Sequence, residues 1–259
     1  MIPYLEFSSV QLGPLTIHVW GFMVASGLLV ALFVGRRIAR KRGLDPNVLM
    51  DLAIWVMVGA LIFGRVIFVL FYGLSHTLED PLWIFRVWEG GMSSFGGYLG
   101  AALGAWLFAR RRKIPLRRHV EVGAFVLPIG YGIGRLGCFL IHDHPGVLTD
   151  FFLAVDFPGG ARLDHGLLLS LTGFGIFALF LIMWRRGWEI GADRWRYLPA
   201  LLIIYGIVRI ILDFLRAWDL PNADARYLYL TPAQYGAMVL VGVGVWMLVK
   251  REEVGKIES

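Results

Sequence analysis

The 259-residue sequence has few charged residues and almost no cysteine. Only 17% of its residues are Asp, Glu, Lys or Arg, whereas about a quarter are charged in a typical soluble domain. The single cysteine, Cys138, excludes a disulfide within the chain and any cysteine-rich metal site. No basic segment precedes the first apolar run, so we expect no cleavable signal peptide. With 58% apolar residues, these absences indicate a membrane protein.

Apolar runs that are long enough to cross a bilayer recur along the chain. About 20 residues suffice for one crossing. We therefore predict an all-α polytopic membrane protein with about seven transmembrane helices in a single transmembrane domain, residues 1–259. The predicted spans are Leu15–Gly35, Leu49–Tyr72, Met92–Ala109, Val120–Ile141, Leu167–Trp184, Tyr197–Leu215 and Pro232–Val249.

Basic residues concentrate in alternate connections between these runs. The first, third and fifth connections and the tail together hold 18 Lys and Arg residues, and the other connections hold four. Because basic connections remain in the cytoplasm, the N-terminus is predicted outside and the C-terminus inside. The basic clusters are short and separated by apolar runs, which does not suit a phosphate-tracking surface. We expect no nucleic-acid partner, and a monomer surrounded by membrane lipids.

Three arginines fall inside the predicted spans: Arg65, Arg135 and Arg209. An arginine at the centre of a membrane helix costs a few kcal/mol on insertion scales. Asp213 follows Arg209 by four residues, on the same helix face, and is predicted to pair with it. For Arg135 two interpretations remain open. Either a carboxylate neutralises it for packing, or it binds an anion, of which a phospholipid phosphate suits the two-donor guanidinium fork.

Two of the outward connections contain more than linker sequence. Residues 73–91 mix apolar and charged side chains, which predicts an interfacial helix at headgroup level. Residues 142–166 have the size of a small periplasmic cap, and their Gly/Pro-punctuated stretch Phe151–Arg162 predicts a short hairpin.

Several motifs, in chain order, resemble those of the prolipoprotein diacylglyceryl transferases. The family signature Gly-Arg-x-Gly-Asn-Phe is similar to Gly134–Phe139, with Gly146 at the motif's end. Further similar segments are Val19–Gly21, Phe63–Arg65, Trp88–Gly97, Gly206–Arg216 and Pro232–Gln234. The chain departs from the family pattern at single positions. The family histidine is replaced by Phe95, the first-span tyrosine by Trp20, the two asparagines by Cys138 and Ile141, and a glutamate by Asp143.

The resemblance implies a reaction and a compartment. It implies transfer of a diacylglyceryl group from phosphatidylglycerol to the lipobox cysteine of a prolipoprotein signal peptide, with release of glycerol phosphate, in the bacterial inner membrane. No cofactor and no metal are expected. The implied substrate-binding residues are Arg135, Arg209, Arg65, Asp213, Arg216, Trp20, Gly96 and Gly97.

That reaction needs positive charge on the departing phosphate and a base for the acceptor thiol. Arg135 can supply the charge, and His142, Asp143 and His144 are the candidate catalytic groups for proton transfer because a histidine titrates near neutrality. The alternative is that this segment is a solvated turn. A metal site of His142 and His144 with His165 is a further alternative, and Cys138 is either a packing residue or a nucleophile.

Two functions of other classes fit parts of the sequence. Intramembrane arginines also line transport pathways, so an anionic-lipid transporter is one rival, although no inverted repeat is visible. The other rival is a paralogue that binds lipid or lipoprotein without catalysis, which the replacement of the family histidine by Phe95 suggests.

Overall fold

The computed structural model describes residues 1–13, 15–87, 90–113, 116–191, 194–221, 223 and 226–257. Helices dominate the chain, and its contacts divide it into two compact units. The first unit comprises Met1–Leu44 and Arg117–Ser259, and the second comprises Asp45–Leu116. Each unit is described by itself.

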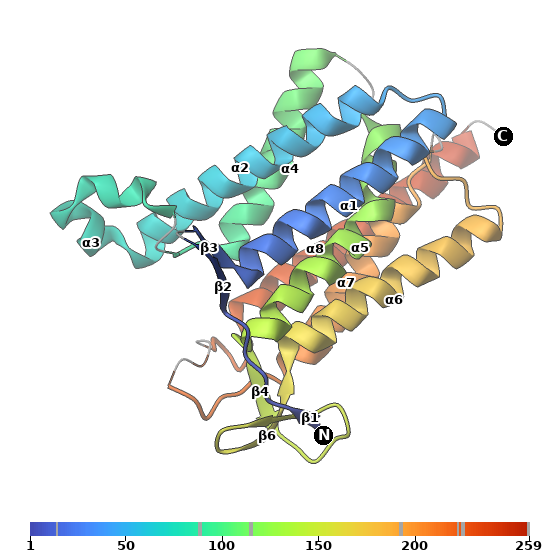
Figure 1. Ribbon diagram of the computed structural model, residues 1–259. Coiled ribbons are helices and arrows are strands. Elements are labelled where there is room, and N and C mark those ends of the chain that lie inside the picture. Colours follow the sequence, from blue (N-terminus) through green and yellow to red (C-terminus); the bar gives the residue numbers. More distant parts are fainter. Residues whose placement is uncertain are drawn as a thin grey trace. The chain divides into compact units, whose positions relative to one another are not determined.

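The first unit contains a bundle of five long helices, which run side by side in Figure 1. They are α1 (Val19–Lys41), α5 (Arg117–Ile141), α6 (His165–Arg185), α7 (Tyr197–Asp213) and α8 (Pro232–Ile257). Small residues allow these helices to pack closely. A Cβ added at Gly27 of α1 would lie 2.4 Å from the carbonyl oxygen of Gly130 on α5, and one added at Gly173 of α6 would lie 2.7 Å from the nitrogen of Gly132. Gly27, Gly130, Gly132 and Gly173 therefore serve helix packing.

A buried carboxylate joins α5 to the beginning of α7. Glu121 is fully buried and accepts hydrogen bonds of 2.9–3.0 Å from the backbone nitrogens of Arg196, Tyr197 and Leu198. The first N–H groups of a helix have no partner within the helix and carry a partial positive charge. Glu121 therefore caps α7, which explains why an acidic residue is retained inside the bundle.

A small sheet lies at one end of the bundle in Figure 1. Its strands are β1 (Ile2–Pro3), β4 (Pro145–Leu148), β5 (Val155–Phe157) and β6 (Gly160–Asp164), in the order β1-β5-β6-β4. β5 and β6 form an antiparallel hairpin that pairs Phe157 with Gly160, and β1 lies parallel to β5. The hairpin predicted within Phe151–Arg162 is confirmed. Asp164 ends β6 and caps α6 by accepting from the nitrogen of Leu167 at 3.0 Å.

A second hairpin precedes the first helix. β2 (Ser9–Leu12) pairs antiparallel with β3 (Leu15–His18). The predicted first span began at Leu15, which was wrong by four residues, because the backbone of Leu15–His18 pairs with β2 and the helix begins only at Val19.

The second unit contains two long packed helices, α2 (Pro46–Tyr72) and α4 (Ser94–Arg112). Glycine again sets their distance, since a Cβ at Gly59 would lie 2.2 Å from the carbonyl oxygen of Gly100. Between them lie α3 (Leu74–Glu79) and the 3₁₀ helix η1 (Pro81–Phe85). The single interfacial helix predicted for residues 73–91 is therefore divided in two. Pro81 disfavours helical geometry at Asp80, and Asp80 caps η1. Trp88 and Glu89 of that prediction lie outside the described residues.

Five helices in the described part of the chain are long and apolar enough to cross a membrane. They are α1, α2 (up to Phe71), α5, α6 and α8 (up to Lys250). The all-α membrane fold is thus confirmed, with α4 and α7 lying where the other two crossings were predicted. The count of seven crossings stays a prediction.

Candidate functional site

The Arg209–Asp213 pair connects α7 to the beginning of α8. Arg209 Nη2 lies 3.0 Å from Asp213 Oδ1, so the predicted pairing is confirmed. Asp213 is fully buried, and its other oxygen accepts a hydrogen bond from the hydroxyl of Thr231. Gln234 of α8 donates to the carbonyl oxygen of Ile210 at 3.0 Å. One arginine of the site is therefore neutralised and held by its own helix.

Arg135 on α5 is held differently. Its Nη1 lies 3.8 Å from the sulfur of Cys138, and its guanidinium lies 5.2 Å from the centre of the Tyr131 ring. Among the residues that the structure describes, no carboxylate forms an ion pair with it. Packing against a neutralising carboxylate does not explain this arginine, and the arrangement favours the anion-binding interpretation.

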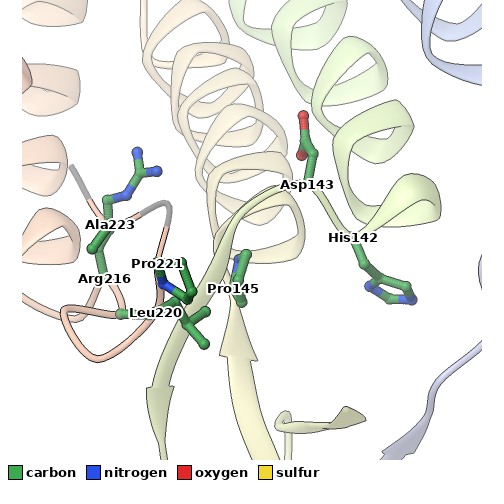
Figure 2. Close-up of a pocket in the computed structure, with 8 residues that line it drawn as sticks. His142, Asp143, Pro145, Arg216, Leu220, Pro221 and Ala223 are labelled. Atoms are coloured by element: carbon green, nitrogen blue, oxygen red, sulfur yellow. The ribbon is translucent and has the colours of Figure 1, made fainter. Parts of the chain in front are cut away.

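His142 serves the fold. The residue has a φ of 50°, and its buried ring places Nδ1 2.8 Å from Asp164 Oδ2. The ring also stacks on Tyr4, with centroids 4.6 Å apart, and contacts the rings of Phe139 and Phe157. Figure 2 shows the ring directed away from Asp143 and Arg216. The structure thus gives His142 a structural role between α5, the sheet and α6, and it is not a solvated turn residue.

Asp143 and His144 lie between α5 and β4, with His144 Nε2 3.7 Å from Asp143 Oδ2. Their side chains are about one-third exposed, 33% and 32%. Burial, reinforced by the charges of Arg216, Arg135 and Arg209, lowers the pKa of His144 to about 3. Burial raises the pKa of Asp143, and Arg135 opposes that shift. His144 is therefore a neutral imidazole in the electrostatic field of arginines from three segments.

A pocket of about 360 Å³ opens beside these residues (Figure 2). It is lined by His142, Asp143, Pro145, Arg216, Ala217, Leu220, Pro221 and Ala223. In Figure 2 the side chains of Asp143 and Arg216 both point upward, toward the helices. The pocket thus combines one acidic and one basic side chain with an apolar wall.

The chain that follows α7 is fixed to the sheet and forms one wall of the pocket. Val147 donates to the carbonyl oxygen of Leu215 at 2.9 Å, and Ala217 donates to that of Pro145 at 3.3 Å. Further on, the guanidinium of Arg162 on β6 donates to both carboxylate oxygens of Asp219, at 3.0 Å for Oδ1. Such two-pronged pairs fix orientation as well as distance. They hold the segment that carries Arg216 in place.

His165 is a residue that the sequence reasoning placed only in a weak metal-site alternative. It begins α6, is fully buried, and neither ring nitrogen has a hydrogen-bond partner among the described residues. Its electrostatic neighbours are Arg216, Arg209 and Asp213. A buried polar group without a partner costs about 1–3 kcal/mol. Nothing in the local sequence indicated this position.

Cys138, Asp143 and His144 bring their potential metal-ligating atoms within 4.8 Å of one another. This trio differs from the His142, His144 and His165 set considered from the sequence. Arg135 lies against the sulfur and two further arginines lie near His144. The resulting positive field disfavours a cation, so the trio fits a metal poorly.

The remaining predicted substrate residues are Trp20 on α1, whose side chain hydrogen-bonds Cys138, and Gly96 and Gly97 of the second unit. Trp20 is half exposed on α1, where its backbone packs against Gly137 of α5. In the second unit a Cβ at Gly96 would lie 2.4 Å from the carbonyl oxygen of Phe63, so Gly96 permits α2 and α4 to pack. A Cβ at Gly97 would lie 3.9 Å from its nearest neighbour, the carbonyl oxygen of Ala60. The side chain of Phe95 lies outside the described residues.

Arg65 has partners other than the predicted phosphate. It is buried, and it donates to the carbonyl oxygens of Trp83, Ile84, Gly90 and Gly91 at 2.5–3.1 Å. Its guanidinium also lies 4.3 Å from the centre of the Trp83 ring. Arg65 thus holds the segment between α2 and α4, and this role explains a buried arginine without a bound anion.

Comparison with known proteins identifies the family of the chain. The sequence matches the prolipoprotein diacylglyceryl transferase family over residues 8–250. It is 33% identical to a phosphatidylglycerol–prolipoprotein diacylglyceryl transferase of Chromohalobacter salexigens over 257 residues, covering 97% of this chain and 95% of that protein. Proteins of the same name are 34% identical in Geobacter sulfurreducens, covering 98% of each chain, and 36% identical in Pseudomonas fluorescens, covering 97% of each.

Proposed function

Because this chain belongs to the prolipoprotein diacylglyceryl transferase family, we propose that it alkylates the lipobox cysteine of a prolipoprotein with the diacylglyceryl group of phosphatidylglycerol. The acceptor sulfur forms a bond to the glyceryl carbon. The bond between that carbon and the phosphate oxygen breaks, and glycerol phosphate leaves with the electron pair. The thiol proton passes to a base of the site.

The proposal rests on Arg135, for which the described residues provide no carboxylate at ion-pair distance. A cation inside a membrane helix needs a counter-ion. Arg209 approaches the same region from α7, since both arginines act electrostatically on His144. We assign the phosphate of the lipid to Arg135 and Arg209, with Arg216 at the edge of the pocket. Charge stabilisation of this kind is usually the largest catalytic contribution.

His144 is the base in this proposal. It is neutral in the empty site because burial and the surrounding arginines hold its pKa at about 3. A bound phosphate offsets those arginine charges and thereby raises the basicity of His144. The base therefore becomes effective when the lipid is in place. Asp143 Oδ2 lies 3.7 Å from His144 Nε2, close enough to stabilise the imidazolium that forms when His144 takes the proton.

The orientation of the chain belongs to the same proposal. The excess of basic residues in alternate connections supports an orientation with the His144 end of α5 on the periplasmic side and the C-terminal tail in the cytoplasm. The site then lies at the outer leaflet, where a translocated prolipoprotein presents its cysteine. A reporter fused after Ser259 should be active only in the cytoplasm.

Arg135→Lys tests the proposal, because lysine keeps the charge and loses the two-donor fork. We expect transfer from labelled phosphatidylglycerol to a lipobox peptide to fall at least about tenfold, with unchanged abundance and thermal stability. Arg37→Lys on α1, where the guanidinium lies 4.0 Å from the Phe33 ring, is the matched control. Full activity of Arg135→Lys would refute the phosphate contact. Movement of labelled lipid across the bilayer without labelling of the peptide would instead indicate a transporter.

A further inference from the structure

The connection between α7 and α8 ends in a turn of unusual composition. Tyr227 and Leu230 exchange two backbone hydrogen bonds, of 2.8 and 3.0 Å, around Leu228 and Tyr229. Both central residues have positive φ values, 47° and 66°. Turns with this geometry strongly prefer Asn and Gly, which adopt positive φ readily. Here the two positions are held by a large apolar residue and an aromatic one.

This turn carries strain and also exposes apolar surface. A non-glycine residue in the left-handed region is strained because its Cβ approaches the backbone too closely, and there are two in succession. Leu228 and Tyr229 are nonetheless 87% and 89% exposed. Neither burial nor backbone preference explains the pair in the isolated protein. A strained segment that presents such side chains indicates a contact outside the chain.

The position of the turn identifies that contact. The apolar span of α8, Pro232–Lys250, begins three residues after Tyr229. Its 19 residues make a helix about 28 Å long, close to the roughly 30 Å of a bilayer's hydrocarbon core. Pro232 therefore lies at the edge of the hydrocarbon, and the turn lies within the headgroup layer beside it. Tyrosine is enriched at that depth because its ring is apolar and its hydroxyl is polar.

The turn is also attached firmly to its base. Tyr235, on the first turn of α8, donates its hydroxyl to the carbonyl oxygen of Tyr227 at 2.7 Å. In Figure 1 the connection between α7 and α8 extends beyond the end of the helix bundle. Trp218, in the same connection, is 73% exposed. The turn thus projects from the bundle and is joined to α8 by this hydrogen bond.

We propose that Leu228 and Tyr229 insert into the lipid interface and anchor the α7–α8 connection to the membrane surface. This connection also carries Arg216, Leu220, Pro221 and Ala223, which line the pocket. Anchoring the turn therefore sets the height of the pocket wall relative to the phospholipid headgroups. The insertion itself does not depend on the proposed function. Its effect on lipid use does.

Depth measurement tests the insertion directly. In a Cys138→Ala background, a nitroxide is attached to Leu228→Cys in nanodiscs of phosphatidylglycerol and phosphatidylethanolamine. Its collision rates with oxygen and with a polar nickel chelate are then measured. Phe33→Cys, on an exposed face of the α1 span, and Asp150→Cys, in the exposed loop after β4, are the membrane and water references. We expect Leu228→Cys to favour oxygen, as the Phe33 site does. Access of the nickel chelate equal to that at the Asp150 site refutes insertion. Protection from the chelate that appears only after lipobox peptide is added also refutes it, and would make the turn a protein-docking element.

A redesigned turn separates fold from anchoring. Leu228→Asn with Tyr229→Gly gives the turn its preferred residues and removes both apolar side chains. We expect an unchanged or higher Tm in detergent, together with a KM for phosphatidylglycerol in nanodiscs about five- to tenfold higher. A wild-type KM in this variant would overturn the anchoring role. If the parent protein transfers no diacylglyceryl group, the proposed function fails, while the nitroxide depth still decides the insertion.

Discussion

Replacing Asp213 by asparagine should separate the chemistry of Arg209 from its contribution to stability. The side chain of Asp213 is fully buried and that of Arg209 is 11% exposed, with 3.0 Å between the paired atoms. Asparagine keeps an oxygen for the hydroxyl of Thr231 but removes the counter-charge. Breaking a buried pair in this way costs about 3–5 kcal/mol. Because Arg209 retains some exposure, we expect about 3 kcal/mol, or a Tm lower by about 6–12 °C.

The double variant Arg209→Gln with Asp213→Asn completes the experiment. Removing both charges leaves no uncompensated ion, so stability should return to within about 1–2 kcal/mol of the parent protein. Transfer activity should not return, because the phosphate loses one of its two arginines. The assays are thermal unfolding in detergent and labelled-lipid transfer in nanodiscs. Recovery of activity with stability would show that Arg209 serves only the fold, and an unchanged Tm in Asp213→Asn would show that the pair contributes nothing.

Three other variants test separate parts of the structure. Glu121→Gln should lower the Tm without changing KM, because a neutral amide caps the three N–H groups of α7 less well than a carboxylate does. His144→Ala should reduce kcat about 100-fold or more. The parent protein should lose stability as the pH falls from 6.5 to 3, because the unfolded chain binds a proton on this imidazole below about pH 6.5 while the folded protein keeps it neutral, with a pKa of about 3. The variant should lose less stability over the same pH range. Asp219→Asn should weaken the attachment of the pocket wall to Arg162 and raise KM more than it lowers kcat. A lower Tm and a lower kcat with an unchanged KM would argue against that role.

Local patterns predicted the membrane helices and one ion pair. Hydrophobic runs and caps are properties of neighbouring residues, and the four-residue spacing of Arg209 and Asp213 places them on one helix face. The Phe151–Arg162 hairpin followed in the same way from its glycines and prolines. These features depend on the chain within one or two helical turns, which is the range that sequence patterns report.

The roles of His142 and Arg65 depend on partners that are distant in sequence. His142 binds Asp164, 22 residues away, and stacks on Tyr4, while Arg65 donates to carbonyl groups up to 26 residues away. A backbone carbonyl has no sequence signature, so a buried arginine that serves carbonyls looks the same in sequence as one that awaits a phosphate. His165 was considered from the sequence only as a metal ligand, since only the packing of α6 shows that its ring is buried without a hydrogen-bond partner among the described residues.

The pairing of Ile2 with Val155 on parallel strands sets an order of events during synthesis. Chains grow at about 5–20 residues per second, so the partner of Ile2 is made roughly 8–30 s after Ile2 itself. By then α1, α2, α4 and α5 have all been made. The first residues of the chain must remain unpaired throughout this interval. The sheet at the end of the bundle is therefore completed late, and the pocket beside it takes its final form only after most of the membrane segments have been made.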